Sequence, residues 1–222
     1  MRPKAEIIQA LLEAKIVAIV RTARPDPIPA ICQALLKGGI TAIEITLTVP
    51  EALAAIRQVR TQFGSQILLG AGSVLEAQSC RAAVEAGAEY IVTPVTKPET
   101  IAEANRSQAP IMSGAYTPTE AQQAHEMGAD FIKIFPADQL GPGYIKALRA
   151  PLPHLRLVPT GGVDLHTATS YLDAGCVALG VGSSLVSAKL VREADWTELT
   201  TLASRFVDLI RAHGGGVAGH PG

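Results

Sequence analysis

The sequence has no long apolar run, no cysteine pattern and no excess of either charge. Its apolar stretches are short and interrupted, and no signal-peptide pattern opens it, so we expect neither a membrane-spanning helix nor a secretory leader. Cys32, Cys80 and Cys176 lack the spacing of a metal site. These absences predict a cytoplasmic protein.

Charge is nearly balanced, with 19 Lys and Arg against 20 Asp and Glu, and basic residues form no long run. A nucleic acid or an anionic membrane would need a basic surface, so neither is an expected partner. The expected partner is a small molecule.

Hydrophobic residues make up 48% of the 222 residues, although only 4% are aromatic. A chain of this length and composition can bury one sizeable core, and α/β barrels of this length form single domains. We predict one domain over residues 1–213 and a flexible C-terminal tail over residues 214–222, which reads GGGVAGHPG.

Short apolar runs alternate with segments of helical spacing after an amphipathic opening segment, KAEIIQALLEA. Several of the helical segments end on Gly, as helices commonly do. This alternation predicts βαβ units and a parallel sheet. The fold class we expect is α/β, a single (β/α)8 TIM barrel with an extra N-terminal helix; an open doubly wound sheet is the alternative. The predicted strands are IVAIVR, AIEITL, ILLGAG, YIVTPV, PIMSGA, DFIKIFPA, LRLVPTGG and VALGVGS.

Two of these strands carry charged residues that must face the barrel interior. In AIEITL the aliphatic residues suit the helix side, which leaves Glu44 and Thr46 inside. The same alternation in DFIKIFPA places Phe131, Lys133 and Phe135 inside. Two opposite charges therefore converge in one barrel.

Buried Lys and Glu are costly, and a structural ion pair is one explanation for them. Lys133, however, lies near the C-terminal end of its strand, the end at which barrel enzymes build their sites. Among the rings of Phe131 and Phe135 its pKa should be lowered, which frees the amine for attack on a carbonyl. Glu44 would then transfer protons as acid and base in turn.

Glycine-rich runs follow the last two predicted strands, VPTGGV at residues 158–163 and GVGSSL at residues 180–185. In barrels these two loops frequently bind phosphate through backbone N–H groups. The hydroxyls of Thr160, Ser183 and Ser184 would add donors. A carboxylate or hydroxyl group of a ligand is the alternative occupant.

The motifs AIEITL, GAGSVL, TPTEA, ADFIKIFPA, VPTGGV and GVGSSL occur in this order along the chain. The chain thus resembles the 2-keto-3-deoxy-6-phosphogluconate/4-hydroxy-2-oxoglutarate (KDPG/KHG) aldolase family over nearly its whole length. The resemblance implies a class I aldolase, usually trimeric, in which Lys133 forms a Schiff base with pyruvate and Glu44 transfers protons. It implies reversible cleavage of a 2-keto-3-deoxy-6-phospho sugar acid to pyruvate and glyceraldehyde 3-phosphate, or of 4-hydroxy-2-oxoglutarate to pyruvate and glyoxylate.

The same resemblance implies substrate-binding residues. Ser73 falls where the family commonly has Thr near the pyruvate carboxylate, and Pro94 falls at a strand end that lines the site. The remaining expected contacts are Thr46 and Phe135 inside the barrel and Thr160, Gly161, Gly162, Gly182 and Ser183 in the phosphate-binding loops.

One position departs from the family. Phosphogluconate-cleaving members carry an Arg shortly after the Glu, in the form EVTLRT, whereas Thr48 stands there in this chain. A threonine cannot neutralise a carboxylate, so we expect Arg21, at the end of the first strand, to replace it. Galactonate-type members resemble this arrangement. The alternative for Arg21 is a solvated charge at a strand end.

The histidines give no support for a metal site. His125, His154 and His166 fall outside the interior strand faces, and no carboxylate cluster accompanies them. We expect no metal and no cofactor, which argues against a class II aldolase. Two other functions stay open: a phosphosugar isomerase or epimerase on the same barrel, and a non-catalytic sugar-phosphate-binding protein.

Overall fold

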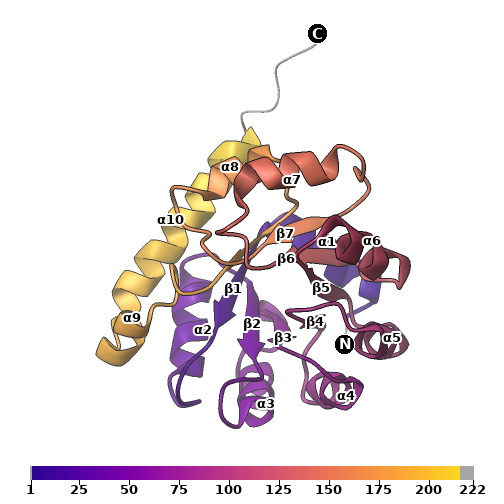
Figure 1. Ribbon diagram of the computed structural model, residues 1–222. Helices are drawn as coiled ribbons and strands as arrows, with labels where there is room; N and C mark the ends of the chain where they lie inside the picture. Colours follow the sequence, from indigo (N-terminus) through magenta and orange to yellow (C-terminus); the bar gives the residue numbers. More distant parts are fainter. Residues whose placement is uncertain (1, 216–222) are drawn as a thin grey trace.

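Eight parallel strands form the sheet at the centre of the computed structural model, which describes residues 2–215 (Figure 1). The strands follow one another in the order β7-β6-β5-β4-β3-β2-β1-β8. A parallel bridge between Thr160 and Gly180 and a 3.0 Å hydrogen bond from the Val177 N–H to the Leu157 carbonyl join the two ends. The prediction of a single barrel is confirmed. The strands are β1 (Ile16–Val20), β2 (Ala42–Thr46), β3 (Leu68–Gly72), β4 (Tyr90–Val92), β5 (Ile111–Ala115), β6 (Phe131–Ile134), β7 (Leu157–Pro159) and β8 (Leu179–Val181).

Helices surround the sheet and connect successive strands (Figure 1). The extra N-terminal helix is present as α1, and the last helix, α10, packs against α2. Helix α10 continues two residues past the predicted end of the domain; the rest of the predicted tail lies outside the described residues. The helices are α1 (Lys4–Ala14), α2 (Ile28–Lys37), α3 (Ala52–Phe63), α4 (Ala77–Glu85), α5 (Pro98–Arg106), α6 (Pro118–Glu126), α7 (Gly141–Arg149), α8 (Ala168–Asp173), α9 (Ala188–Glu193) and α10 (Trp196–Gly215), with a 3₁₀ turn at Gly64–Gln66.

Two separate apolar cores follow from the alternation of side chains along each strand. The isoleucines of β2 and β6 belong to the core between sheet and helices, as predicted. Inside the barrel, one apolar layer takes side chains from β1 to β7 and from Ala178, which directly precedes β8, and it includes Ile7 and Leu11 of α1. This layer fills one end of the barrel and leaves the polar interior residues at the other. Its strand members are Val17, Ala42, Leu68, Tyr90, Val92, Met112, Phe131 and Val158.

The TPTEA segment sets the start of α6. The Thr117 hydroxyl accepts a hydrogen bond from the Glu120 N–H at 3.2 Å, and the Glu120 carboxylate accepts one from the Thr117 N–H at 2.8 Å. Pro118 occupies the first helical position, where a missing N–H costs nothing. This capping box satisfies two of the N–H groups that a helix start leaves unpaired.

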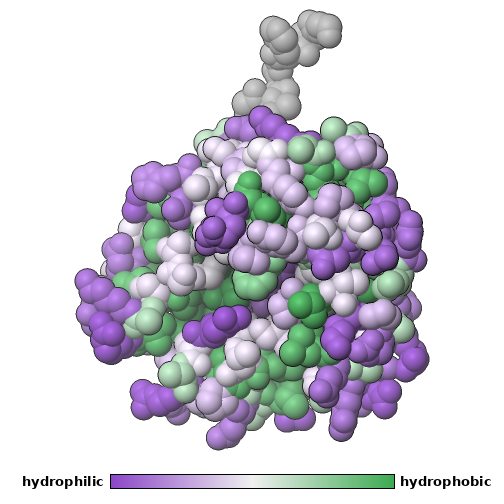
Figure 2. All heavy atoms as spheres, in the orientation of Figure 1, coloured by the Kyte–Doolittle hydropathy of each residue, from purple (hydrophilic) through white to green (hydrophobic). Residues whose placement is uncertain are grey.

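On the face drawn in Figure 2, strongly hydrophilic side chains lie mostly around the edge of the view, and hydrophobic ones gather nearer its centre. No helix within residues 2–215 is long and apolar enough to cross a membrane.

Candidate active site

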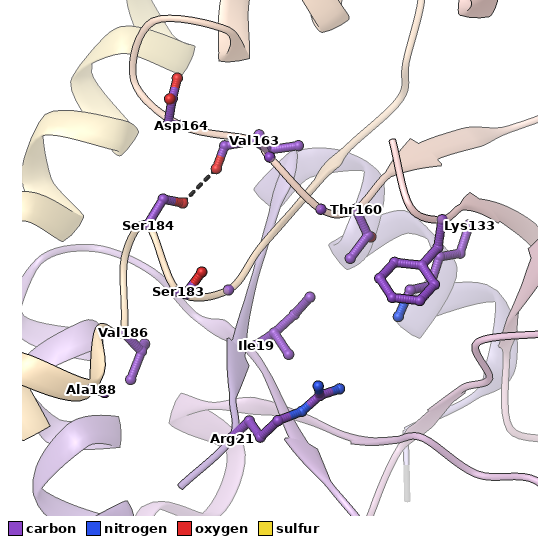
Figure 3. A pocket seen from close by; sticks show the side chains of 14 residues that line it. Ile19, Arg21, Lys133, Thr160, Val163, Asp164, Ser183, Ser184, Val186 and Ala188 are labelled. Carbon is purple, nitrogen blue, oxygen red and sulfur yellow. Dashed lines mark hydrogen bonds between the residues drawn. The ribbon is translucent and has the colours of Figure 1, made fainter. Parts of the chain in front are cut away.

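A cavity of about 360 Å³ lies beyond the carboxyl ends of β1, β6, β7 and β8 (Figure 3). Most of the predicted site residues border it, namely Arg21, Lys133, Phe135, Thr160, Gly161, Gly162, Gly182 and Ser183. The others, Glu44, Thr46, Ser73 and Pro94, are not among its lining residues. Parallel strands bring their carboxyl ends to one edge, which explains why residues far apart in sequence meet here.

Lys133 reaches the cavity from inside the barrel and is 6% exposed. Its Nζ lies 5.1 Å from the centre of the Phe135 ring, and its neighbour on β5 is Gly114. Burial lowers the pKa of Lys133 from its ordinary value; the Glu44 charge opposes this shift and the Arg21 charge reinforces it. More of the side chain is therefore the neutral amine, which is the form that attacks a carbonyl.

Glu44 lies on β2 and is 2% exposed. Its carboxyl group lies over Gly72 of β3, because a Cβ on Gly72 would stand 1.7 Å from Oε1 of Glu44. Burial raises the pKa of Glu44, while the charges of Lys133 and Arg21 act in the opposite direction. A raised pKa makes the carboxylate a better proton acceptor.

Lys133 and Glu44 influence each other's pKa without forming a contact pair. Among the ion pairs within 4.0 Å in residues 2–215, none joins these two side chains. The structural ion pair considered from the sequence is therefore not what holds them inside the barrel.

The loops after β7 and β8 meet at one wall of the cavity. Gly161 and Gly162 have φ of +93° and +70°, a conformation that side chains disfavour, and a Cβ on Gly162 would stand 2.4 Å from Cβ of Asp138. The Ser184 hydroxyl donates a hydrogen bond to the Val163 carbonyl and links the two loops (Figure 3). This bond fixes the shape of the wall.

Backbone N–H groups of this wall are available to an anion. Within residues 2–215, the N–H groups of Gly162, Gly182 and Ser183 donate no hydrogen bond to a turn, loop or side-chain acceptor, whereas Gly161 directly follows Thr160, which forms the parallel bridge with Gly180. Successive free N–H groups beside glycines are the usual means of binding a phosphate or carboxylate in such loops.

Arg21 follows the last residue of β1, and its side chain borders the cavity (Figure 3). Its charge acts on both Glu44 and Lys133. A second cavity of about 310 Å³ shares Arg21 and also includes Arg24 and Arg192. Arg21 thus lies at the cavity, and its role toward an anionic ligand stays a prediction.

The predicted residues outside the cavity lining occupy distinct places. Thr46 is fully buried, and its hydroxyl lies 2.9 Å from that of Thr48. Ser73 directly follows β3 and has a φ of +57°. The backbone of Pro94 packs against Gly114, where a Cβ would stand 2.1 Å from the Pro94 carbonyl carbon.

Several lining residues were not predicted to take part in the site: Ile19, Val163, Asp164, Val186 and Ala188. Asp164 accepts hydrogen bonds from the N–H groups of His166 and Thr167 at 2.8 and 2.9 Å. Burial acts to raise the pKa of Asp164, but these hydrogen bonds prevail and lower it. An Asp side chain that accepts hydrogen bonds from N–H groups two and three residues later is typical of a turn, so an Asp in this loop was a signal that the sequence contained.

Metal ligands are not grouped in the described part of the chain. No three His, Cys, Asp or Glu side chains of residues 2–215 gather so that they could hold a metal ion. The rings of His125 and His154 lie 4.9 Å apart, away from the cavity lining.

Comparison with known proteins gives consistent matches. The family model "KDPG and KHG aldolase" matches residues 7–202. A 2-dehydro-3-deoxy-phosphogluconate aldolase of Haemophilus influenzae is 34% identical over 93% of this chain and 97% of its own. A 2-dehydro-3-deoxy-6-phosphogalactonate aldolase of Escherichia coli K12 is 37% identical over 78% of this chain and 85% of its own. A crystal structure of a KDPG aldolase from Legionella pneumophila, with pyruvate captured as a covalent carbinolamine, superposes with a TM-score of 0.83 at 26% identity, covering 92% of this chain and 97% of that one.

Proposed function

Because this chain belongs to the KDPG and KHG aldolase family and is therefore a class I aldolase, we propose that it cleaves a 2-keto-3-deoxy-6-phospho sugar acid to pyruvate and glyceraldehyde 3-phosphate. The observation that carries this proposal is the buried amine of Lys133 at a cavity whose opposite wall presents free N–H groups. The amine supplies the nucleophile, and the wall would hold the phosphate.

In the proposed reaction, Nζ of Lys133 attacks the C2 carbonyl, and loss of water gives an imine. Glu44 takes the proton of the C4 hydroxyl while the C3–C4 bond breaks, and the bonding electrons pass into an enamine on Lys133. The aldehyde leaves. Protonation of C3 by Glu44 and hydrolysis of the imine then release pyruvate and restore the amine.

The other predicted residues would bind the substrate. The N–H groups of Gly162, Gly182 and Ser183, in the loops that also contain Gly161, would hold the phosphate. The guanidinium of Arg21 would hold the substrate carboxylate. In phosphogluconate-cleaving members this is the expected role of the Arg that stands at the position of Thr48. Thr46, Ser73, Pro94, Phe135 and Thr160 complete the proposed set of substrate-binding residues.

The choice of substrate follows from Arg21. The arrangement matches what we expect of galactonate-type members, and the relative named for 6-phosphogalactonate has the higher identity of the two sugar-acid aldolases compared. We therefore place the galactonate-type phospho sugar acid first. 4-Hydroxy-2-oxoglutarate is a second proposed substrate, which would give pyruvate and glyoxylate and leave the phosphate wall unused. We also propose a cytoplasmic homotrimer, which sedimentation analysis would test.

Borohydride trapping tests the central step. The protein is reduced with borohydride in the presence of pyruvate, and the adduct is located by intact and peptide mass spectrometry. We expect an adduct on Lys133 in the wild type, none in Lys133→Met, and an unchanged adduct in Lys146→Met, since Lys146 is an exposed lysine of α7. A folded wild type without an adduct would contradict the aldolase mechanism, because an epimerase or a sugar-phosphate sensor forms no imine.

A further inference from the structure

Tyr90 of β4 carries a buried hydroxyl group that the proposed reaction does not yet use. The side chain is 0% exposed, and within the described residues its hydroxyl has no hydrogen-bond partner. Buried tyrosine hydroxyls usually find a partner, because an unpaired polar group in an apolar interior is destabilising. The position of this hydroxyl therefore calls for an explanation.

Strand register puts Tyr90 in one row with Glu44. Tyr90 pairs with Gly70 of β3, and Gly70 pairs with Glu44 of β2. A Cβ on Gly70 would stand 2.3 Å from Cζ of Tyr90 and 2.2 Å from its Cε2, so the ring lies across β3. Because the hydroxyl extends beyond Cζ, it points past β3 toward β2.

The carboxyl group of Glu44 reaches the same part of the interior from the other side. It lies over Gly72, two residues along β3 from Gly70 and on the same face. Two residues of a parallel strand span about 6.6 Å. The two glycines thus leave room on one face of β3 for the phenol ring and the carboxyl group, and since the Tyr90 hydroxyl has no direct partner within the described residues, a water is the link left between them.

Charges near these groups agree with this placement. Burial raises the pKa of Tyr90, and the charges of Glu44 and Glu89 raise it further, so the hydroxyl keeps its proton at neutral pH and can only be a donor toward a carboxylate. Lys133 on β6 and Arg21 after β1 are the other charged groups that act on Glu44.

We propose that the Tyr90 hydroxyl positions Glu44 for proton transfer, donating a hydrogen bond to its carboxylate through one bridging water. The inference rests on the proposed function, in which Glu44 carries the proton. A donor aimed at the carboxylate favours its ionised form and opposes the effect of burial. Glu44 is then ionised, and correctly oriented, when the C4 hydroxyl must lose its proton.

Tyr90→Phe tests this role, since it keeps the ring over Gly70 and removes only the oxygen. We expect kcat for cleavage to fall about tenfold, the order of one hydrogen bond to a charged group. The acid limb of the kcat profile should move to higher pH, because Glu44 loses a donor. KM and borohydride trapping at Lys133 should change less than about twofold, since binding and imine formation do not need this bond. Tyr144→Phe is the matched control: its hydroxyl bonds to the Tyr116 carbonyl on the outside, and no change is expected.

A second comparison separates positioning from packing. In a Glu44→Gln background, Tyr90→Phe should have no further effect on kcat, because the group it positions is gone. An unmoved acid limb, with or without a lower melting temperature, would overturn the inference, and so would full additivity of the two substitutions. A wild type that forms no borohydride adduct would overturn the proposed function as well, whereas an adduct together with an unmoved limb overturns this inference alone.

Discussion

Replacing Gly72 by Ala should remove most of the activity while leaving the fold and imine formation intact. The added methyl group would stand 1.7 Å from Oε1 of Glu44 and 2.4 Å from its Cδ. Ordinary contact distances are about 3.5 Å or more, so the carboxyl group must move by more than about 1 Å. A misplacement of about 1 Å can cost about a hundredfold in rate. We therefore expect kcat to fall about a hundredfold, equivalent to about 2.7 kcal/mol in the activation free energy.

The assay follows pyruvate release from the phospho sugar acid under saturating conditions, with borohydride trapping of pyruvate run in parallel. Trapping at Lys133 should persist, because the substitution affects the proton carrier and not the nucleophile. Gly143→Ala serves as the control: Gly143 lies in α7, and a Cβ there meets nothing within 4 Å. A Gly72→Ala enzyme that keeps more than about half of the wild-type kcat would refute the assigned position of Glu44 or its role.

Three further predictions address binding, pH dependence and stability. Arg21→Ala should raise KM at least about tenfold, the value of a hydrogen bond to a charged group, while Thr48→Ala changes it little; equal, small effects would remove Arg21 from the site. Burial raises the folded-state pKa of Glu44 above the ordinary 4.5. Ionisation of Glu44 therefore lowers the free energy of unfolding as pH rises from 4.5 through the folded-state pKa. The melting temperature of Glu44→Gln relative to wild type should therefore increase from pH 4 to pH 8, and a pH-independent difference would contradict the shift. Thr117→Ala should lower the free energy of unfolding by about 1 kcal/mol through loss of the α6 cap, as measured by urea unfolding, whereas Thr117→Ser should retain it.

The sequence alone was enough to predict the elements and the direction of the side chains along them. All eight predicted strands are present, and the interior position of Lys133 and Glu44 follows from a period of two that any strand obeys. Such features depend on near neighbours in the chain. The Gly-rich loops could also be predicted, because glycines that directly follow a strand are a local sequence signal.

The contacts of those side chains with residues of adjacent strands could not be predicted from the sequence. Alternation places Glu44 inside the barrel, but it does not reveal that its carboxyl group lies over Gly72 or that Tyr90 crosses Gly70. Those contacts depend on the register between adjacent strands, which the sequence of either strand does not state. The same holds for Thr46, which is fully buried with its hydroxyl beside that of Thr48.

The sequence by itself thus determined the barrel, the interior position of Lys133 and the two Gly-rich loops, since periodicity and glycine conformations are encoded residue by residue. Closure of the barrel decided the rest. It brings together the loops after β7 and β8, which the Ser184 hydrogen bond links. It also fixes the shear of the barrel, and with it the register that aligns Glu44, Gly70 and Tyr90 on adjacent strands. Shear is a property of all eight strands at once, so only the tertiary structure can specify which side chains share the space around Glu44.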